Sequence, residues 1–217
     1  LARGRFERGH FGAALALAGD IDRDGVDDVW IGAPGAREKM SDANCGEVVL
    51  LSGRNGRVLS TVAPSGDDAS FAHSLAGLDD LDGDGVPELA AGARRQVQPQ
   101  VTIGLVRIVS GASGRMLREF VARTNAETFA YALASVPDAN GDGHRDLAVG
   151  VPDSFHGGTW GSVRLHASSD GVELFERYFD AEPILHGMGV SLAVTRDIDG
   201  DGIDDLIVGA PDVLLGG

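Results

Sequence analysis

The chain has 217 residues, of which 43% are hydrophobic, 6% are aromatic and 32 are glycine. Its formal net charge of −15 argues against a nucleic-acid-binding protein, because such proteins need lysine and arginine to displace the counterions of the phosphate backbone. A single cysteine excludes an internal disulfide framework. The sequence contains no run of 18 apolar residues, so it predicts no membrane-spanning helix. Abundant glycine with few aromatic residues favours short strands joined by tight turns, and therefore an all-β chain.

The first elements in chain order are two strands joined by an acidic loop. A candidate strand follows Phe11-Gly12 and leads into the nine-residue loop 20–28, and the apolar segment 29–32 follows directly. Segment 46–59 then holds a third candidate strand, the small-residue turn Ser52-Gly53 and the start of a fourth strand. In the later repeat of this segment, Val163-Arg164-Leu165-His166, apolar and polar residues alternate. We therefore expect the third strand to be an outer strand with one face in water.

The acidic loop and its flanking strands return three more times, and segment 46–59 returns twice, at 104–117 and 161–174. The acidic loops begin at residues 20, 80, 138 and 197, so the periods are 60, 58 and 59 residues. Four strands in each period are typical of a β-propeller blade. We therefore predict one β-propeller domain over residues 1–217, built of four-stranded antiparallel blades in repeats of about 59 residues, at approximately 10–69, 70–127, 128–186 and 187–217, the last incomplete.

Each acidic loop has the ligand spacing of a hard-cation site. Carboxylates or an amide stand at positions 1, 3, 5 and 9, glycine holds position 6, and position 7 offers its backbone carbonyl. Ca²⁺ takes six to eight oxygen ligands, and four bound ions would change the net charge from −15 to −7. The predicted ligands of up to four Ca²⁺ ions are Asp20, Asp22, Asp24, Val26 and Asp28 (loop 1); Asp80, Asp82, Asp84, Val86 and Glu88 (loop 2); Asp138, Asn140, Asp142, His144 and Asp146 (loop 3); and Asp197, Asp199, Asp201, Ile203 and Asp205 (loop 4).

Two other interpretations of these loops were weighed. Asp and Gly also favour plain solvated turns, but four copies in register, each leading into the same kind of strand, argue against that interpretation. An EF-hand loop needs an acidic residue at position 12 and flanking helices, whereas position 12 is apolar in all four copies: Ile31, Ala91, Val149 and Val208. Loop 3 has one charge fewer, and we expect it to be the weakest site.

Phe11-Gly12, the DxDxDGxxD loop at 20–28 and Gly32-Ala33-Pro34 together resemble the FG-GAP repeat of integrin α-subunits and of many bacterial extracellular proteins. The resemblance implies a β-propeller in which each calcium loop joins the first two strands of a blade, with ligands bound on the opposite face. It also implies that the Phe-Gly and Gly-Ala-Pro positions pack blade against blade. Four full periods would need roughly 236 residues, so we expect part of a larger propeller or one completed by another copy.

No catalytic site is predicted, since GxSxG, GxxxxGK[ST], HExxH and CxxC motifs are absent. The expected function is a calcium-binding extracellular interaction or adhesion module with a protein or glycan ligand. Alternatives are an accessory propeller of a secreted lyase or lipase, and a lectin-like propeller in which Trp30, Trp160 and Tyr131 stack on sugars instead of packing between blades. Millimolar calcium is an extracellular condition, so we expect an extracellular, periplasmic or cell-surface location.

Overall fold

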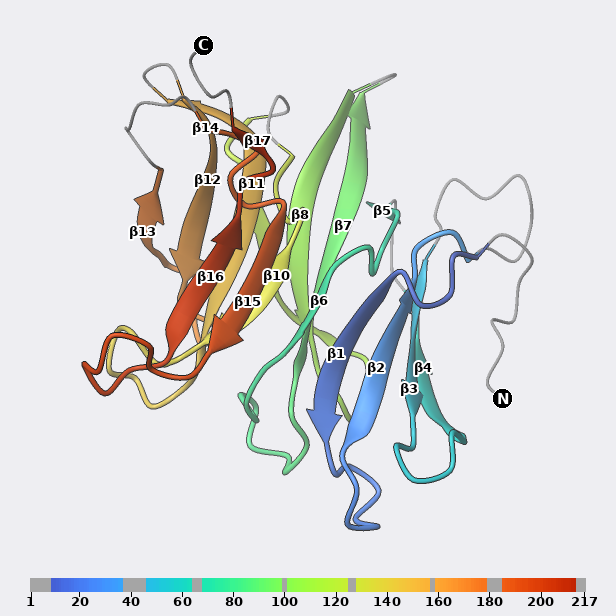
Figure 1. The fold of residues 1–217 in the computed structure, drawn as a ribbon. Helices are drawn as coiled ribbons and strands as arrows, with labels where there is room; N and C mark the ends of the chain where they lie inside the picture. The colour runs from blue at the N-terminus through green and yellow to red at the C-terminus, as the bar shows by residue number, and fades with distance from the viewer. Residues whose placement is uncertain are drawn as a thin grey trace.

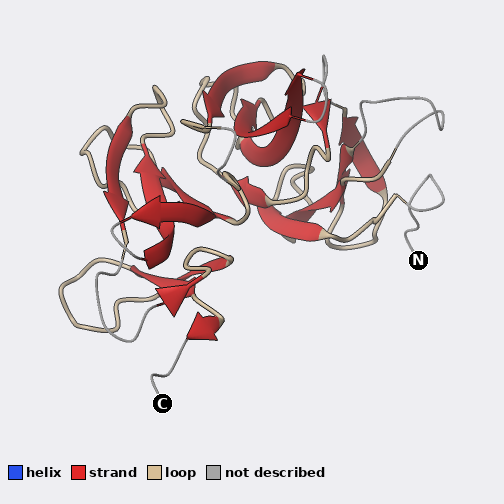
Figure 2. Cartoon of the chain, turned by 90° about the horizontal axis from the view of Figure 1, so that it is seen from above, coloured by secondary structure: helices blue, strands red, loops and turns tan. Residues whose placement is uncertain are grey.

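The computed structural model describes residues 9–36, 46–63, 68–98, 101–124, 128–156, 159–178 and 185–213, and these residues form strands and turns without a helix. The sheets stand side by side with their strands running up and down in Figure 1. Seen from above in Figure 2, the sheets follow one another in an arc from the N-terminus to the C-terminus.

Blade 1 is a four-stranded antiparallel sheet whose strands are hydrogen-bonded in sequence order. Neighbouring strands are consecutive in the chain, so each connection is a hairpin. The strands are β1 (Ala14–Gly19), β2 (Asp28–Ala33), β3 (Glu47–Leu51) and β4 (Val58–Val62).

Blades 2 and 3 repeat this order with longer central hairpins. In blade 2 the short β5 (Asp68–Ala69) and β6 (Leu75–Gly77) both pair with one edge of β7 (Leu89–Gln98). The other edge of β7 pairs with β8 (Val101–Val109), and β8 pairs with β9 (Met116–Val121). Blade 3 comprises β10 (Leu133–Val136), β11 (Asp146–His156), β12 (Thr159–His166) and β13 (Glu173–Arg177).

Blade 4 consists of the antiparallel pair β15 (Ser191–Thr195) and β16 (Asp205–Gly209). A separate two-stranded sheet joins β14 (Leu185–His186) to β17 (Asp212–Val213). The chain is thus an all-β propeller of antiparallel blades whose arc is open, as the sequence predicts.

The hydrophobic core lies between blades. One cluster joins Trp30 and Leu50 of blade 1 to Leu75 and Leu89 of blade 2. A second cluster joins blades 2 and 3, and a third joins blades 3 and 4. Because a single flat sheet cannot bury both of its faces, the blades stabilise one another by covering the apolar side chains between them.

The Phe-Gly and Gly-Ala-Pro positions meet across each blade junction. A Cβ added at Gly32 in blade 1 would lie 2.2 Å from the carbonyl oxygen of Ala72, which is the second residue of the next Phe-Gly position. The same contact recurs from Gly150 to the carbonyl oxygen of Gly189, at 2.0 Å. Ala72 has φ +69° and Gly189 has φ +95°, a left-handed conformation that favours glycine. The expected blade-to-blade packing of these motifs is confirmed.

The expectation of a half-wet third strand is wrong. Arg164 and His166, predicted to face water, are only 1% and 6% exposed, and β3 is buried along its whole length. The third strand lies between the second and fourth strands of its own sheet, so both of its edges are covered. Arg164 is accommodated there because its Nε lies 3.1 Å from Oε1 of Glu176 on β13.

Candidate metal centres

All four acidic loops connect the first and second strands of their blades and lie at the same end of the molecule, at the bottom of Figure 1. They join β1 to β2, β6 to β7, β10 to β11 and β15 to β16. Position 9 of each loop is the first residue of the second strand or directly precedes it, so the buried strand fixes where its carboxylate points.

Position 1 builds the turn. The Asp20 carboxylate accepts hydrogen bonds from the N–H groups of Asp24 and Gly25, at 2.9 and 2.8 Å. Asp138 and Asp197 accept equivalent bonds, and those from Gly143 and Gly202 lower their pKa values. Position 5 adds a second turn bond by accepting the N–H of position 7, which is Val26, Val86, His144 or Ile203. Part of the acidic pattern therefore serves the backbone of the loop itself.

Position 9 closes the loop from inside. Asp205 Oδ2 accepts the N–H of Ile198 at 2.6 Å, Asp146 Oδ2 accepts that of Ala139 at 2.8 Å, and Glu88 Oε2 accepts that of Leu81. Asp28, Glu88 and Asp146 are each 0% exposed. An acidic side chain is thus held under the loop and away from bulk water, where an ionised carboxylate is costly without a compensating charge.

Three of the loops gather carboxylates around one centre. Within each group, one oxygen from every member lies within 4.8 Å of the others: Asp20, Asp22 and Asp28; Asp80, Asp82, Asp84 and Glu88; and Asp197, Asp199 and Asp205. Among the described residues, the predicted ligands Asp24, Asp201 and those of loop 3 belong to no such group. In loop 3, Asp142 Oδ2 instead accepts hydrogen bonds from Asn140 Nδ2 and the Ser169 hydroxyl, at 3.0 and 2.5 Å.

Several carboxylate oxygens in these loops are buried and have no hydrogen-bond partner. They are Asp22 Oδ1, Glu88 Oε1 and Asp146 Oδ1. Burial, reinforced by the charges of Asp82, Asp80 and Asp84, raises the pKa of Glu88 to about 7, and burial also raises the pKa of Asp146. Burial and then the charges of Asp24 and Asp28 raise the pKa of Asp22. Asp22 Oδ1 and Glu88 Oε1, which lie in two of the carboxylate groups, fit a bound cation, because a hard divalent ion would give each of them a partner.

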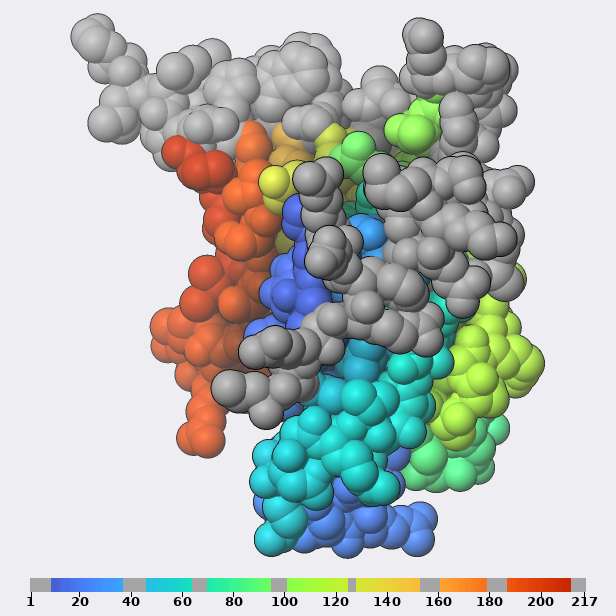
Figure 3. Space-filling model, turned by 90° about the vertical axis from the view of Figure 1, so that its right-hand side faces the viewer, coloured from blue at the N-terminus to red at the C-terminus, as the bar shows by residue number. Residues whose placement is uncertain are grey.

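Sequence reasoning missed the outer hairpin as part of the site. Gly53, in the β3–β4 turn, donates its N–H to Asp28 Oδ1 at 3.0 Å, and a Cβ added there would lie 1.9 Å from the carbonyl oxygen of Asp27. Gly111 has the same close approach, at 2.1 Å from the carbonyl oxygen of Pro87. In Figure 3 the β3–β4 turn, in cyan, sits directly on the blue loop 1. The in-phase small-residue turns were the available signal.

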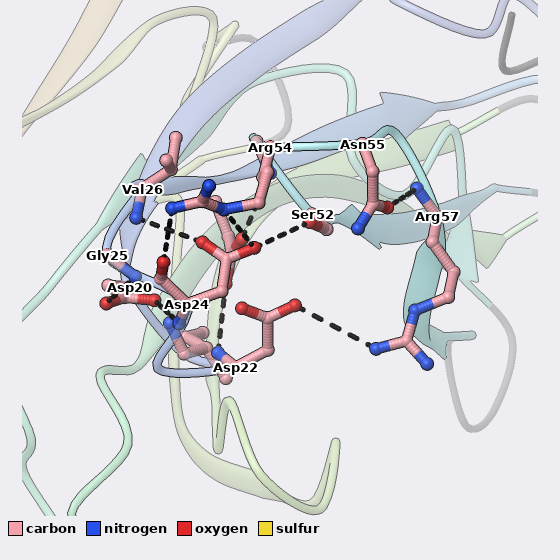
Figure 4. A network of polar contacts seen from close by, with 12 residues as sticks. Asp20, Asp22, Asp24, Gly25, Val26, Ser52, Arg54, Asn55 and Arg57 are labelled. Atoms are coloured by element: carbon pink, nitrogen blue, oxygen red, sulfur yellow. Dashed lines mark hydrogen bonds and ion pairs between the residues drawn. The ribbon is translucent and has the colours of Figure 1, made fainter.

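Arginines from these hairpins also reach the loops. In Figure 4, Arg54 approaches Asp24, with Nε 3.3 Å from Oδ2, and Arg57 approaches Asp22. Arg115 makes the corresponding approach to Asp82 in loop 2. In blades 1 and 2 the site is therefore built from two hairpins, with the acidic loop on the inner hairpin and its supports on the outer hairpin.

Known proteins with similar sequences contain the same kind of repeat. The FG-GAP repeat profile matches residues 11–51, 129–163 and 188–216. Integrin alpha pat-2 of Caenorhabditis elegans is 26% identical over 214 residues, covering 88% of this chain and 17% of that protein. Integrin alpha-5 of Xenopus laevis is 28% identical over 206 residues, covering 84% of this chain and 19% of that protein.

Integrin alpha-X of Homo sapiens is 41% identical over 100 residues, covering 41% of this chain and 8% of that protein. A solved structure described as "Structure of Dos1 propeller" aligns with a TM-score of 0.46 at 12% identity, covering 80% of this chain and 37% of that one. The chain spans less than a fifth of the length of these integrins. The three segments that match the FG-GAP repeat and the similarity to integrin α-subunits support an FG-GAP or integrin-like β-propeller.

Proposed function

We propose that this chain is a calcium-binding FG-GAP propeller in which Ca²⁺ ions hold the acidic loops, and that it acts as an extracellular interaction or adhesion module without catalytic activity. The observation that carries the proposal is the set of buried, unpartnered carboxylate oxygens, above all Glu88 Oε1 inside a group of four carboxylates. A turn that needed its acidic residues only for backbone hydrogen bonds would have no use for that oxygen.

Calcium fits the loops better than magnesium. The groups contain three or four acidic side chains, so a bound ion would take its further oxygens from a backbone carbonyl and water. Mg²⁺ demands near-ideal octahedral geometry and keeps much of its water, whereas Ca²⁺ accepts six to eight oxygens in irregular arrangements. Multi-carboxylate loops of this kind suit millimolar calcium, which supports a location outside the cell, in the periplasm or on the cell surface.

The partner surface in this proposal is the face opposite the loops, for a protein or glycan ligand. The central hairpins of blades 2 and 3 are longer than that of blade 1: β7 and β11 have 10 and 11 residues, against 6 in β2. In Figure 1 the β7–β8 hairpin extends farthest from the acidic loops. Extended, blade-specific hairpins supply the shape differences that selective binding requires. Within the part of the chain that the structure describes, no helix has the length and apolar character to cross a bilayer.

The face of blade 1 turned away from blade 2 is a second candidate surface, for association with another blade. Leu15 on β1 is 63% exposed, whereas Leu75 and Leu133 at the same repeat position are buried against the preceding blade. An exposed side chain at a position that is otherwise covered by a blade supports docking of a similar sheet there. A Leu15→Asp variant that stays as associated as the wild type in sedimentation velocity would contradict this.

Thermal unfolding in calcium and after chelation tests the metal proposal. Each site filled at about 100 times its Kd adds about 2.7 kcal/mol of stability, so calcium is expected to raise Tm strongly. Magnesium at the same concentration serves as the control and should raise Tm less. Equal Tm values in calcium and in chelator would refute the proposal.

A further inference from the structure

Two arginines occupy the same repeat position and contact the same loop position. Arg57 and Arg115 each follow the positive-φ glycine of an outer hairpin. Arg57 Nη2 lies 3.9 Å from Oδ2 of Asp22, and Arg115 Nη2 lies 3.6 Å from Oδ2 of Asp82. Both acceptors are position 3 of their loops. Two independent copies of the repeat therefore use one guanidinium for one particular carboxylate.

The third repeat changes both partners together. Val172 follows Gly171 where Arg57 and Arg115 follow their glycines, and position 3 of loop 3 is the neutral amide Asn140. Val172 is 56% exposed, so space does not exclude an arginine there. Across these three repeats the arginine is present where position 3 is charged and absent where it is neutral, which links the arginine to the charge of that residue.

The two oxygens of the position-3 carboxylate have different surroundings. Asp22 Oδ1 is buried and without a partner, whereas Oδ2 is the oxygen that Arg57 approaches. Figure 4 shows Asp22 between Asp20 and Asp24 on one side and Arg57 on the other. In loop 2, Asp82 stands in the group that contains the 0% exposed Glu88 with its unpartnered Oε1. One oxygen can thus face the ion while the other is held from behind.

We propose that Arg57 and Arg115 are positioning residues for the cation: each holds the outer oxygen of the position-3 carboxylate so that its inner oxygen points at the loop centre. The inference rests on the proposed function, since it needs an ion in the loop. Partners behind a metal ligand restrict its orientation, and their loss typically costs 10- to 100-fold in metal affinity. Loops 1 and 2 consequently bind calcium more tightly than loop 3.

The arginines contribute to ion affinity far more than to the stability of the ion-free fold. Their side chains are 69% and 68% exposed, and exposed ion pairs contribute little to folding because water and salt screen them. A purely structural arginine would show the reverse pattern. This difference allows the experiment to separate the two roles.

The test is a calcium titration of the 217-residue chain followed by hydrogen exchange of residues 80–88 and 138–146, which resolves loops 2 and 3 separately. Arg115→Gln is expected to weaken calcium protection of loop 2 about tenfold and to leave Tm in chelator unchanged. Arg115→Lys, which keeps the charge without the forked geometry, should fall in between. In loop 3, the pair Asn140→Asp with Val172→Arg should bind more tightly than Asn140→Asp alone.

The outcomes are distinguishable. A wild-type chain whose loops gain no protection from calcium overturns the proposed function and this inference with it. If loop 2 of Arg115→Gln is protected at the same or a lower calcium concentration than in the wild type, the inference about the arginines is overturned and the proposed function is not. A variant that loses Tm in chelator yet keeps its calcium affinity assigns Arg115 a structural role and also overturns it.

Discussion

Replacing Glu88 by glutamine should raise stability in the absence of calcium and reduce the further stabilisation that calcium gives. In the ion-free protein Glu88 is fully buried, and its carboxylate lies within 4.8 Å of those of Asp80, Asp82 and Asp84. One pair of unit charges at 4.8 Å repels by about 0.9 kcal/mol at the dielectric constant of water, so three pairs cost about 2 to 3 kcal/mol. The amide removes that repulsion and keeps an oxygen that can accept the Leu81 N–H.

The effect depends on pH in a defined direction. Because the pKa of Glu88 is raised from 4.5 to about 7 in the folded protein, the native state holds this proton more strongly than the unfolded chain. The resulting stability is present below pH 4.5 and is lost as pH rises to about 7. Glu88→Gln should therefore match the wild type near pH 4.5 in chelator and exceed it at pH 8, by roughly 4 to 12 °C in Tm.

In calcium the same substitution removes one ligand charge, so the calcium-induced rise in Tm should be smaller than in the wild type. Asp28→Asn is the matched control, since Asp28 holds the same repeat position but accepts hydrogen bonds on both oxygens from Ile21, Asp22 and Gly53. It should lower Tm in chelator as well. Scanning calorimetry in low salt measures both variants. A Glu88→Gln variant that loses stability equally in chelator and calcium refutes the reasoning.

Further predictions concern the blade junctions. Burial lowers the pKa values of His166 and His73, so stability should fall as pH drops from 6.5 through those lowered values. His166→Leu should reduce this dependence in urea unfolding at pH 5 and 7.5, and an unchanged dependence would contradict the assignment to His166. Gly32→Ala should destabilise by about 1 to 3 kcal/mol, and adding Ala72→Gly should not rescue it, because the clash is with a backbone carbonyl; full rescue would contradict the contact. Trp30→Ala should cost about 3 to 5 kcal/mol, whereas Trp30→Phe should cost much less because the buried indole N–H has no partner; equal losses in urea unfolding would argue otherwise.

Local patterns and repetition made most of the fold predictable. The four loops in register place the first and second strands, and the apolar segment after each loop becomes the buried second strand, as in Leu89 and Leu147. The third strand departs from the prediction because its alternation of apolar and charged residues does not mark a face in water. Arg107 and Arg164 are buried there because Glu119 and Glu176 stand across from them on the fourth strand, which is a tertiary pairing that local periodicity does not contain.

The acidic groups of the candidate site were predictable from the sequence, whereas the residues that support them were not. The spacing of Asp80, Asp82 and Glu88 follows from the geometry of one loop, so sequence alone indicates it. The contacts of Gly53 and Arg115 join residues about 25 to 33 positions away from their partners. Such contacts depend on how two hairpins pack, and only the in-phase turns hinted at them.

The junction between Gly32 and Ala72 defines the exchangeable unit of the molecule. The residue that follows each phenylalanine or methionine of the Phe-Gly position reaches back over the preceding sheet, where only a glycine leaves space for its carbonyl oxygen. A segment transplanted between such proteins should therefore begin after this residue and end with its counterpart one period later. If the segment were cut at the strand boundaries instead, the glycine and the carbonyl oxygen that it accommodates would come from different proteins. The hybrid would then have a poor steric fit at both junctions.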